Sequence, residues 1–238
     1  MKQVLIRAST RGHIDHGWLD THHTFSFADY YDPTRIHFGA LRVINDDIVI
    51  GGEGFGTHPH DNMEIISIPL YGELEHKDSM GFSGVIRPGE VQVMSAGTGI
   101  THSEFNGNKE RPLNFFQIWI FPNQRDVEPR YEQREFDFIH SKNYFQQIVS
   151  PNPDDEGLWI HQDAWLSIGT FDNEFETEYR IKRQGNGVYV MVVDGEFIVE
   201  DQVLYHRDGL GIWETDTVKI KSASDNARLM IIDVPMAV

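Results

Sequence analysis

The chain has 238 residues and no cysteine, and its 37 acidic against 20 basic residues give a formal charge of −17. This charge argues against direct binding to nucleic acid or to an anionic membrane, and the lack of cysteine excludes disulfides and thiolate chemistry. The first apolar run is only Val4 to Ile6, and no window approaches the roughly 18 apolar residues of a membrane helix. A soluble, cytoplasmic protein is therefore expected.

Short strand-like segments dominate the chain. They are rich in β-branched and aromatic residues and are bounded by Gly, Pro, Asn or Asp, and they lie at 40–50, 63–76, 91–96, 113–121, 188–200, 210–214 and 227–234. Residues 127–143 look like a connector with one turn of helix at most, and 150–157 is a turn cluster. This pattern predicts an all-β protein built as a sandwich or barrel.

Two parts of the chain echo each other. "LYGELEH" at 70–76 is similar to "VVDGEFIVE" at 192–200, and "RPGEVQVMSA" at 87–96 is similar to "HRDGLGIWET" at 206–215. A β unit used twice is the simplest interpretation, and convergent turn chemistry is the alternative.

Two pairs of potential ligands have the spacing of residues on one face of a strand. His58 and His60 flank Pro59, and His102 and Glu104 repeat the i, i+2 arrangement. Successive side chains on a strand alternate between faces, so each pair can point the same way, and the residue before proline favours extended backbone. If the two strands face each other, three imidazoles and one carboxylate converge.

Three nitrogen ligands and one oxygen ligand suit Fe, Mn, Co, Ni, Cu or Zn, with positions left for water or substrate. The alternative is that these are surface or hydrogen-bonding histidines beside glycines that serve tight turns. The spacing alone does not decide between the two interpretations.

A family resemblance adds to this pattern. "GEGFGTHPHDNMEIISIPLYG" resembles the first motif of the cupin superfamily, and "AGTGITHSEFN" resembles the second, although Gly97 stands where proline is usual. More narrowly, "GELEHKDSMG", "RPGEVQVMSAGTGITHSE" and "EPRYEQREF" resemble the pirin family. The opening "RGHIDHGWLDTHHTFSFADYYDP" resembles the bacterial pirin-like quercetinases of that family.

The resemblance implies a bicupin fold, with two antiparallel jelly-roll β-barrels in tandem. The expected division is an N-terminal cupin domain with the metal site at residues 1–130. A C-terminal cupin domain without metal ligands, preceded by a short connector, is expected at residues 131–238.

The resemblance also assigns roles to residues of this chain. The metal ligands of the family fall on His58, His60, His102 and Glu104. Glu64, the acid of the general cupin motif, is expected beside the ligands or in a structural role. Phe55 matches a residue that lines the metal cavity and substrate site, with an ordinary core aromatic as the alternative.

The other nine histidines are expected to be exposed or hydrogen-bonded. The adjacent His22 and His23 should point to opposite faces of an extended segment, and no partner at ligand spacing is expected for His13, His16, His37, His76, His140, His161 and His206. "FSFADYYDP" at 25–33 is expected to pack in the core. Counting from the echoed glycines places the C-terminal counterparts of the four ligands at Ile181, Arg183, Ser222 and Ser224. None is a typical transition-metal ligand, so one metal per chain is expected.

The implied function is a metal-dependent quercetin 2,3-dioxygenase that uses one divalent metal, with Fe(II) preferred, and takes a flavonol and O2. Glu104 would be its catalytic base, receiving the proton of the substrate's 3-hydroxyl. One alternative is a pirin-type regulatory protein with a protein partner, and another is a cupin isomerase or hydrolase. A monomer is expected.

Overall fold

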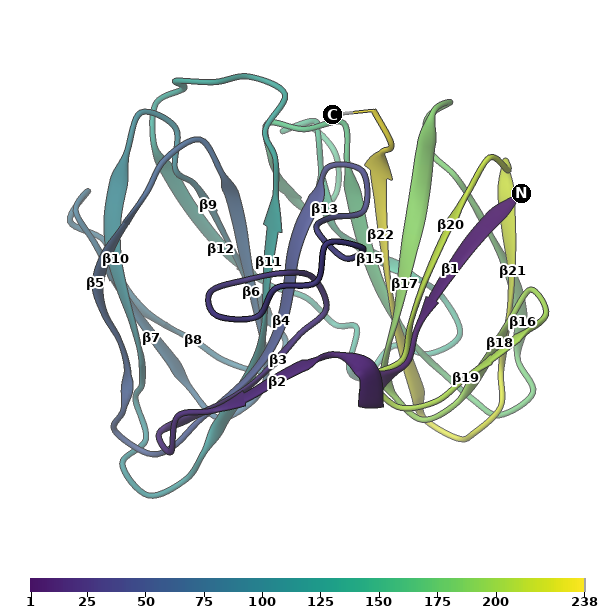
Figure 1. Ribbon diagram of the computed structural model, residues 1–238, viewed down its shortest axis with the longest axis horizontal. Helices are drawn as coiled ribbons and strands as arrows, with labels where there is room; N and C mark the ends of the chain where they lie inside the picture. The colour runs from purple at the N-terminus through teal and green to yellow at the C-terminus, as the bar shows by residue number, and fades with distance from the viewer. Residues whose placement is uncertain (238) are drawn as a thin grey trace.

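The computed structural model describes residues 1–237, and the helix found among them is one turn of 3-10 helix, η1 (Ala8–Thr10). Figure 1 shows two β halves side by side, with both ends of the chain on the second half. The chain begins in β1 (Lys2–Ile6), which pairs with the second half, and crosses through η1 to the first.

The first half consists of two antiparallel sheets. The larger has the order β12-β9-β6-β11-β4-β3-β2 and the smaller β5-β10-β7-β8. Their bounds are β2 (Gly12–Asp15), β3 (Leu19–His23), β4 (Leu41–Val49), β5 (Gly54–His60), β6 (Glu64–Tyr71), β7 (Leu74–Asp78), β8 (Ser83–Ile86), β9 (Glu90–Ser95), β10 (Ile100–Asn106), β11 (Leu113–Ile120) and β12 (Arg130–Glu135).

The second half repeats this plan. Its larger sheet has the order β1-β20-β17-β22-β15-β13-β14 and its smaller sheet β16-β21-β18-β19, with one parallel pair, β13 and β14. Their bounds are β13 (Gln146–Ser150), β14 (Leu158–Trp159), β15 (Trp165–Phe171), β16 (Glu176–Arg180), β17 (Asn186–Asp194), β18 (Phe197–Val199), β19 (Gln202–Leu204), β20 (Gly209–Trp213), β21 (Thr217–Ser222) and β22 (Ala227–Pro235).

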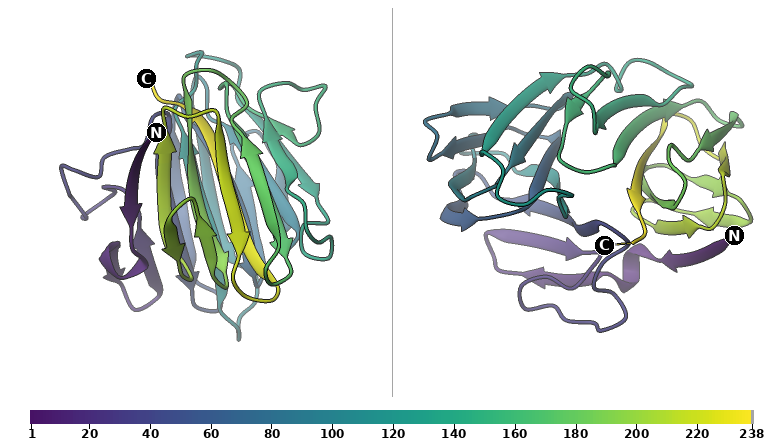
Figure 2. Two further views of the ribbon diagram at one scale, coloured as in Figure 1. Left: turned by 90° about the vertical axis from the view of Figure 1, so that its right-hand side faces the viewer. Right: turned by 90° about the horizontal axis from the view of Figure 1, so that it is seen from above.

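The expected all-β fold of two tandem jelly-roll units is confirmed. Among the described strands no hydrogen-bonded ladder joins the two sheets of either half, so each half is a pair of facing sheets rather than a closed ring. The view from above in Figure 2 shows the two halves meeting along their larger sheets. The division at residue 130 stays a prediction.

The largest apolar core lies between the halves. It contains Ile66 and Phe116 from the first half and Tyr189 and Ile232 from the second. Neighbouring strand residues point to opposite faces, so in the middle of β4, β6 and β11 the even-numbered residues face the second half. The odd-numbered residues there face the interior of the first half, where the candidate ligands lie.

The two interiors differ in polarity. The second half is filled by one continuous apolar cluster that includes Val190, Phe197 and Ile220. The interior of the first half is divided into two small apolar clusters, around Phe115 and around Met94. Buried polar side chains, among them His76, His102 and Glu104, occupy the interior of the first half beside these two clusters.

The connector at 127–143 was expected without a strand, and this expectation is wrong. Residues 130–135 form β12, which pairs antiparallel with β9 at the edge of the larger sheet, and no helix forms in 127–143. The strand consists of charged and polar residues apart from Tyr131, and such a composition suits the edge of a sheet. The turn cluster at 150–157 is confirmed as turns and bends after β13.

The internal echo corresponds to equivalent turns, each of which leads from the larger sheet of a half to its smaller sheet. β6–β7 and β17–β18 each turn at a glycine with positive φ, Gly72 at 86° and Gly195 at 79°. The second echo is offset, because Gly89 has a φ of 92° before β9, whereas Arg207 takes the positive φ before β20 and Gly209 lies inside that strand.

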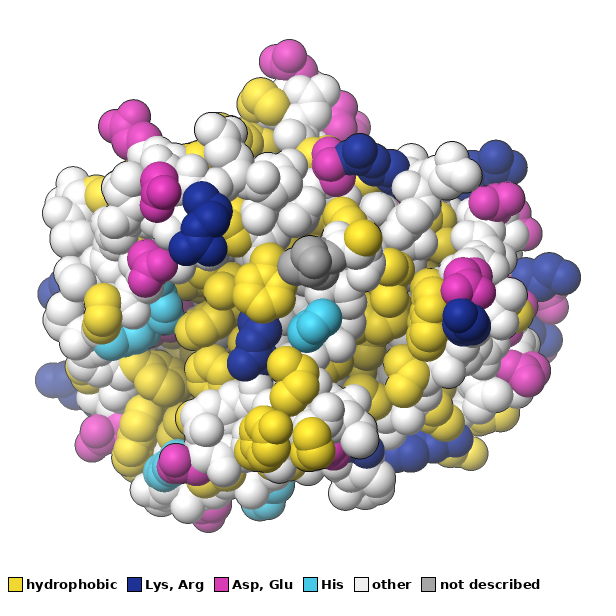
Figure 3. Space-filling model, turned by 45° about the horizontal axis from the view of Figure 1, so that its top comes forward, with side chains coloured by type: hydrophobic (Ala, Val, Ile, Leu, Met, Phe, Trp, Pro, Cys, Tyr) yellow, Lys and Arg dark blue, Asp and Glu magenta, His cyan; other side chains and the backbone are white. Residues whose placement is uncertain are grey.

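On the face shown in Figure 3, hydrophobic side chains gather over the middle and charged side chains of both signs lie mostly toward the edges. Within residues 1–237 no helix has the length and apolar character needed to cross a membrane. The expected cytoplasmic location stays a prediction.

Candidate metal centre

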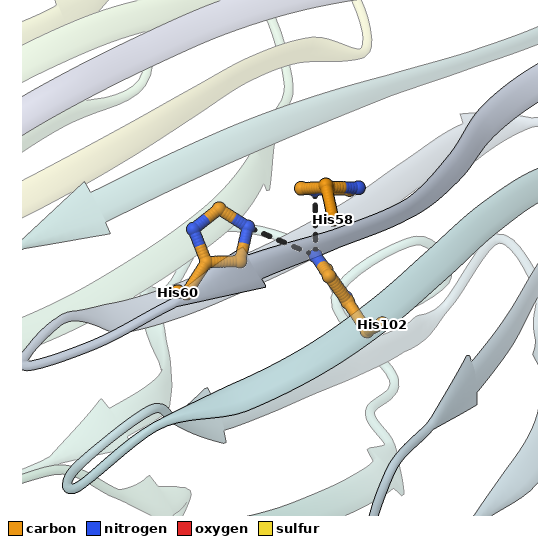
Figure 4. Close-up of side chains that lie close together, drawn as sticks. All are labelled: His58, His60 and His102. Atoms are coloured by element: carbon orange, nitrogen blue, oxygen red, sulfur yellow. Dashed lines mark hydrogen bonds between the residues drawn. The ribbon is translucent and has the colours of Figure 1, made fainter.

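Three histidines converge in the interior of the first half. β5 and β10 pair antiparallel, with His58 directly opposite His102 and His60 opposite Ile100. Strand alternation turns His58 and His60 to the same side, and the burial of β10 alternates so that His102 and Glu104 both point inward. Figure 4 shows the three imidazoles directed toward one another from the two neighbouring strands.

The distances between the imidazoles are those of a ligand set. The Nε2 atom of His102 lies 3.0 Å from Nε2 of His58 and 3.1 Å from Nε2 of His60. At a metal–nitrogen distance of about 2.1 Å, two ligands at a right angle lie about 3.0 Å apart. The three nitrogens therefore fit around one divalent transition metal.

The protonation of the imidazoles also suits a metal. Burial, with repulsion from neighbouring imidazoles, lowers the pKa of His60 to about 4 and that of His102 to about 3. Both are neutral at pH 7 and keep a lone pair. His58 donates its Nδ1 proton to the carbonyl oxygen of Gly56 at 2.8 Å, so its Nε2 also presents a lone pair.

Glu104 lies beside this triad and is held by two donors. The hydroxyl of Ser67 donates to its Oε1 at 3.1 Å, and the amide of Gln117 donates to its Oε2 at 2.8 Å. Its carboxylate groups with His102 and His76 within 4.8 Å, rather than with all three histidines of the triad. The carboxylate thus lies beside the triad and lines the same cavity as His58 and His60.

His76 was expected to have no partner at ligand spacing, and this expectation is wrong. It is fully buried on β7, opposite Glu104 on β10, and its ring centroid lies 5.3 Å from that of His102. Its Nε2 lies 3.0 Å from Oδ2 of Asp78. In the sequence, His76 and Asp78 form another i, i+2 pair. Only the register between β7 and β10 shows that this pair lies beside the triad.

A cavity of about 180 Å³ lies beside the triad, and we call it the metal cavity. Its wall consists of Phe27, Asn45, Asp47, Phe55, His58, His60, Glu104, Gln117 and Trp119. Phe55 lines this cavity, with its ring centroid 5.2 Å from that of Trp18 and 6.5 Å from that of His58. The lining of the cavity therefore combines aromatic side chains with polar and ionisable ones.

The aromatic segment at 25–33 only partly follows the expectation of core packing. Phe25 is buried in the core between the halves, as expected. Phe27 instead lines the metal cavity, with its ring edge-on to Trp119 at 5.2 Å. Aromatic composition alone does not distinguish a core position from a cavity wall.

Asp47 is a buried carboxyl in the cavity wall that the sequence did not single out. Burial raises its pKa to about 7, opposed by a hydrogen bond of 2.5 Å from the hydroxyl of Thr21. The cavity therefore contains two carboxyl groups, Asp47 and Glu104, on different strands.

Comparisons with known proteins agree over nearly the whole chain. A family model described as Pirin matches residues 6–120, and one described as Quercetinase C-terminal cupin domain matches residues 147–234. The quercetin 2,3-dioxygenase of Escherichia coli (strain K12) is 44% identical over 97% of this chain and 98% of its own length. A pirin-like protein of Caulobacter vibrioides is 38% identical over 93% of this chain and 95% of its own.

The chain belongs to the pirin family. The crystal structure of YhhW from Escherichia coli matches with a TM-score of 0.94 and 43% identity, covering 100% of this chain and 99% of that chain. A structure of the same bacterial pirin in complex with nickel(II) matches with a TM-score of 0.93 and 42% identity, covering 100% of both chains. The relative therefore binds nickel.

In this pirin family member, Glu64 lies on the opposite face of β6 from the metal cavity. It has the parity of Ile66 and Ile68, so it faces the second half of the chain, and it accepts a hydrogen bond of 2.7 Å from the hydroxyl of Ser95. Burial raises its pKa to about 7, opposed by Ser95, His161 and Arg130. Glu64 is structural, the second of the two expected roles.

Replacing Glu64 by Gln should make the stability less sensitive to pH. The pKa of Glu64 rises from 4.5 to about 7 on folding, so the folded chain binds more protons than the unfolded chain between these values. Stability is therefore lost as pH rises through this window, by about 3 kcal/mol. Urea unfolding should show that the free energy of unfolding of Glu64→Gln increases relative to that of the wild type between pH 5 and pH 8. If the two chains differ in unfolding free energy by the same amount at pH 5 and at pH 8, the raised pKa does not belong to Glu64.

The remaining histidines follow the expectations in part. His22 is half-buried and His23 is buried, so they do point to opposite faces of β3. His13 and His22 nevertheless group with Asp20 at ligand distance on the exposed β2–β3 hairpin, although no such partner was expected. His16, His37, His140, His161 and His206 join no group of three potential ligands within residues 1–237.

In the second half, the four counterpart positions do not come together to form a metal site. Ile181 packs against the apolar cluster, Arg183 is exposed, and Ser222 is buried on β21. Ser224 lies beyond that strand and accepts a hydrogen bond from the backbone of Glu196. Within the described residues of this half no group of three potential ligands occurs.

The metal-loaded chain should therefore contain close to one metal ion per chain. The triad supplies three buried or half-buried nitrogens, whereas the second half offers an apolar interior. Elemental analysis after removal of loosely bound metal by a weak chelator measures the ratio. A ratio near two that persists when His13 is replaced by Ala would mean that a second site of comparable strength exists.

Proposed function

We propose that the chain is a metal-dependent dioxygenase that cleaves flavonols such as quercetin. Its metal ligands are His58, His60, His102 and Glu104, with Fe(II) as the preferred metal and Mn, Co, Ni, Cu and Zn as alternatives. The observation that carries the proposal is the convergence of three imidazoles beside a buried carboxylate, in a cavity that is open to a substrate. The relatives named quercetin 2,3-dioxygenase support the choice of substrate.

A bound divalent metal supplies Lewis acidity, lowers the pKa of a hydroxyl group placed beside it and leaves positions open for small ligands. The chain itself supplies the proton acceptor. Glu104 is buried and receives the proton of the flavonol 3-hydroxyl at a carboxylate oxygen. Ser67 and Gln117 donate hydrogen bonds to this carboxylate, so they orient it in the cavity.

The wall of the cavity suits one end of a planar aromatic substrate. Phe27, Phe55 and Trp119 surround the entrance, and flat aromatic rings favour stacked or edge-on contact with such side chains. The cavity of about 180 Å³ is smaller than the typical range of about 300–1,000 Å³ for pockets that enclose a whole drug-sized ligand. The ring that carries the 3-hydroxyl therefore enters, and the rest of the flavonol lies at the entrance.

Anaerobic reconstitution with each metal, followed by a quercetin assay in air, tests the function. We expect loss of quercetin absorbance only with the reconstituted chain, fastest with Fe(II). If every metal-loaded form leaves all flavonols unchanged, the chain has a regulatory role or another cupin reaction. The monomeric state and the alternative of a protein partner stay predictions.

A further inference from the structure

A second, larger cavity lies where the two halves meet beside η1. Its volume is about 620 Å³, and it is lined by Ala8, Ser9, Arg11, His22, Asp46, Ile48, Leu70, Tyr71, Asn114, Asp194, His206, Arg207 and Arg228. In Figure 1, η1 is the dark purple coil at the lower edge of the junction between the two halves. Its size falls in the range of pockets that bind small molecules. We call it the junction cavity.

The junction cavity is separate from the metal cavity. The two lie on opposite faces of the larger sheet of the first half, and consecutive residues of β4 divide between them. Asn45 and Asp47 line the metal cavity, whereas Asp46 and Ile48 line the junction cavity. This is the alternation of a strand, so the sheet itself is the wall between the two cavities.

Positive charge gathers in the junction cavity although the chain as a whole is strongly negative. Three arginines line it, Arg11, Arg207 and Arg228, against two aspartates, Asp46 and Asp194. Residue numbers show that the arginines come from distant parts of the chain. Folding therefore assembles this charge from both halves.

The carboxylate of Asp46 already has ion-pair and hydrogen-bond partners within the protein. Its Oδ2 lies 2.8 Å from Nε of Arg207 and 3.6 Å from Nη1 of Arg11, and its Oδ1 accepts a hydrogen bond of 2.8 Å from Asn114. Arg207 is the partner that neutralises it. Asp46 is therefore shared between two arginines and compensates the positive charge of Arg11 only in part.

Arg228 and Arg11 each retain N–H groups that can donate a hydrogen bond to a ligand. The nearest carboxylate to Arg228 is Asp194, at 3.9 Å, beyond hydrogen-bond distance, and Asp194 is half exposed. Within residues 1–237 the Nε atoms of both arginines are buried without a hydrogen-bond partner. Burial is also the largest cause lowering the pKa of each guanidinium, and the neighbouring carboxylates, Asp46 for Arg11 and Asp194 for Arg228, offset it only in part.

We propose that the junction cavity binds a small organic anion, whose carboxylate or phosphate group pairs with Arg11 and Arg228. Guanidinium groups bind both kinds of anion through paired N–H donors. The apolar part of the ligand lies against Ile48, Leu70 and Tyr71, which line the same cavity. The ligand touches both halves of the chain and is independent of the metal.

Calorimetric titration of the metal-loaded chain with benzoate and with inorganic phosphate, at constant ionic strength, tests the proposal. We expect one anion per chain for at least one probe, and the tighter probe identifies the preferred charged group. Ser9→Glu places a carboxylate at the exposed rim of the cavity without changing the core, and it should weaken binding about tenfold or more. Thr10→Glu, one residue on and outside the lining, should not.

A second pair of variants removes charge instead of adding it. Arg228→Met should weaken binding about tenfold or more, whereas Arg134→Met, an exposed arginine on β12, should leave it unchanged. No saturable binding of either probe would overturn the proposal. Equal weakening by Thr10→Glu and Ser9→Glu would also overturn it, since it would indicate a general charge effect. Binding lost in the His60→Ala, His102→Ala chain would place the anion on the metal and overturn it too.

Discussion

Replacing His60 and His102 together by Ala should abolish tight metal binding and leave a folded chain. The two substitutions remove two of the three nitrogens that converge at 3.0 and 3.1 Å from one another. Loss of a residue that merely supports a metal ligand costs about 10–100-fold in affinity, so loss of two direct ligands should cost more. The fold should persist, because burial disfavours the charged form of both imidazoles and neither anchors an ion pair. Elemental analysis and circular dichroism measure the two properties.

The exposed hairpin cluster provides the matched control. His13→Ala with His22→Ala also removes two grouped histidines, but at the surface of β2 and β3. This control should retain its metal. Full metal occupancy in the His60→Ala, His102→Ala chain would place the metal elsewhere.

Glu104→Gln should keep most of the metal and lose most of the turnover. The three imidazoles remain to hold the ion, whereas an amide cannot accept the 3-hydroxyl proton. Loss of a general base costs about 10²–10⁴ in rate. Metal content and quercetin consumption should be compared with the wild type at equal metal loading. We expect the variant to bind the flavonol and to consume little of it.

Glu64→Gln is the matched control for this variant. It makes the same change at another buried glutamate, but on the face of β6 that points to the second half. Its turnover should equal that of the wild type. A Glu104→Gln chain that turns over at the wild-type rate would mean that Glu104 is not the base, and one that loses all its metal would mean that Glu104 is needed mainly as a ligand.

Local patterns explain what the sequence predicted well. Strand segments such as 113–121 and 227–234 were recognisable from composition, and β11 and β22 occupy them within one residue at either end. The i, i+2 spacing placed His58 with His60 and His102 with Glu104, because alternation is a property of one strand. The pairing of β5 with β10 is consistent with the family resemblance.

Features that depend on register between strands could not be predicted. His76 comes beside His102 only because β7 pairs with β10, and nothing near His76 in the sequence fixes this register. Glu64 resembles a ligand of the general cupin motif, but its parity on β6 turns it away from the cavity. The arginines of the junction cavity, Arg11, Arg207 and Arg228, meet only after both halves have folded.

Turnover of quercetin under ¹⁸O₂ by the metal-loaded chain tests the central claim most directly. A dioxygenase incorporates both atoms of O2 into its products, so mass spectrometry should find two ¹⁸O atoms per flavonol cleaved. This labelled product should disappear in the His60→Ala, His102→Ala chain, which lacks two of the three converging imidazoles. A product that carries ¹⁸O only from labelled water, or a flavonol recovered unchanged, would contradict the proposed dioxygenase.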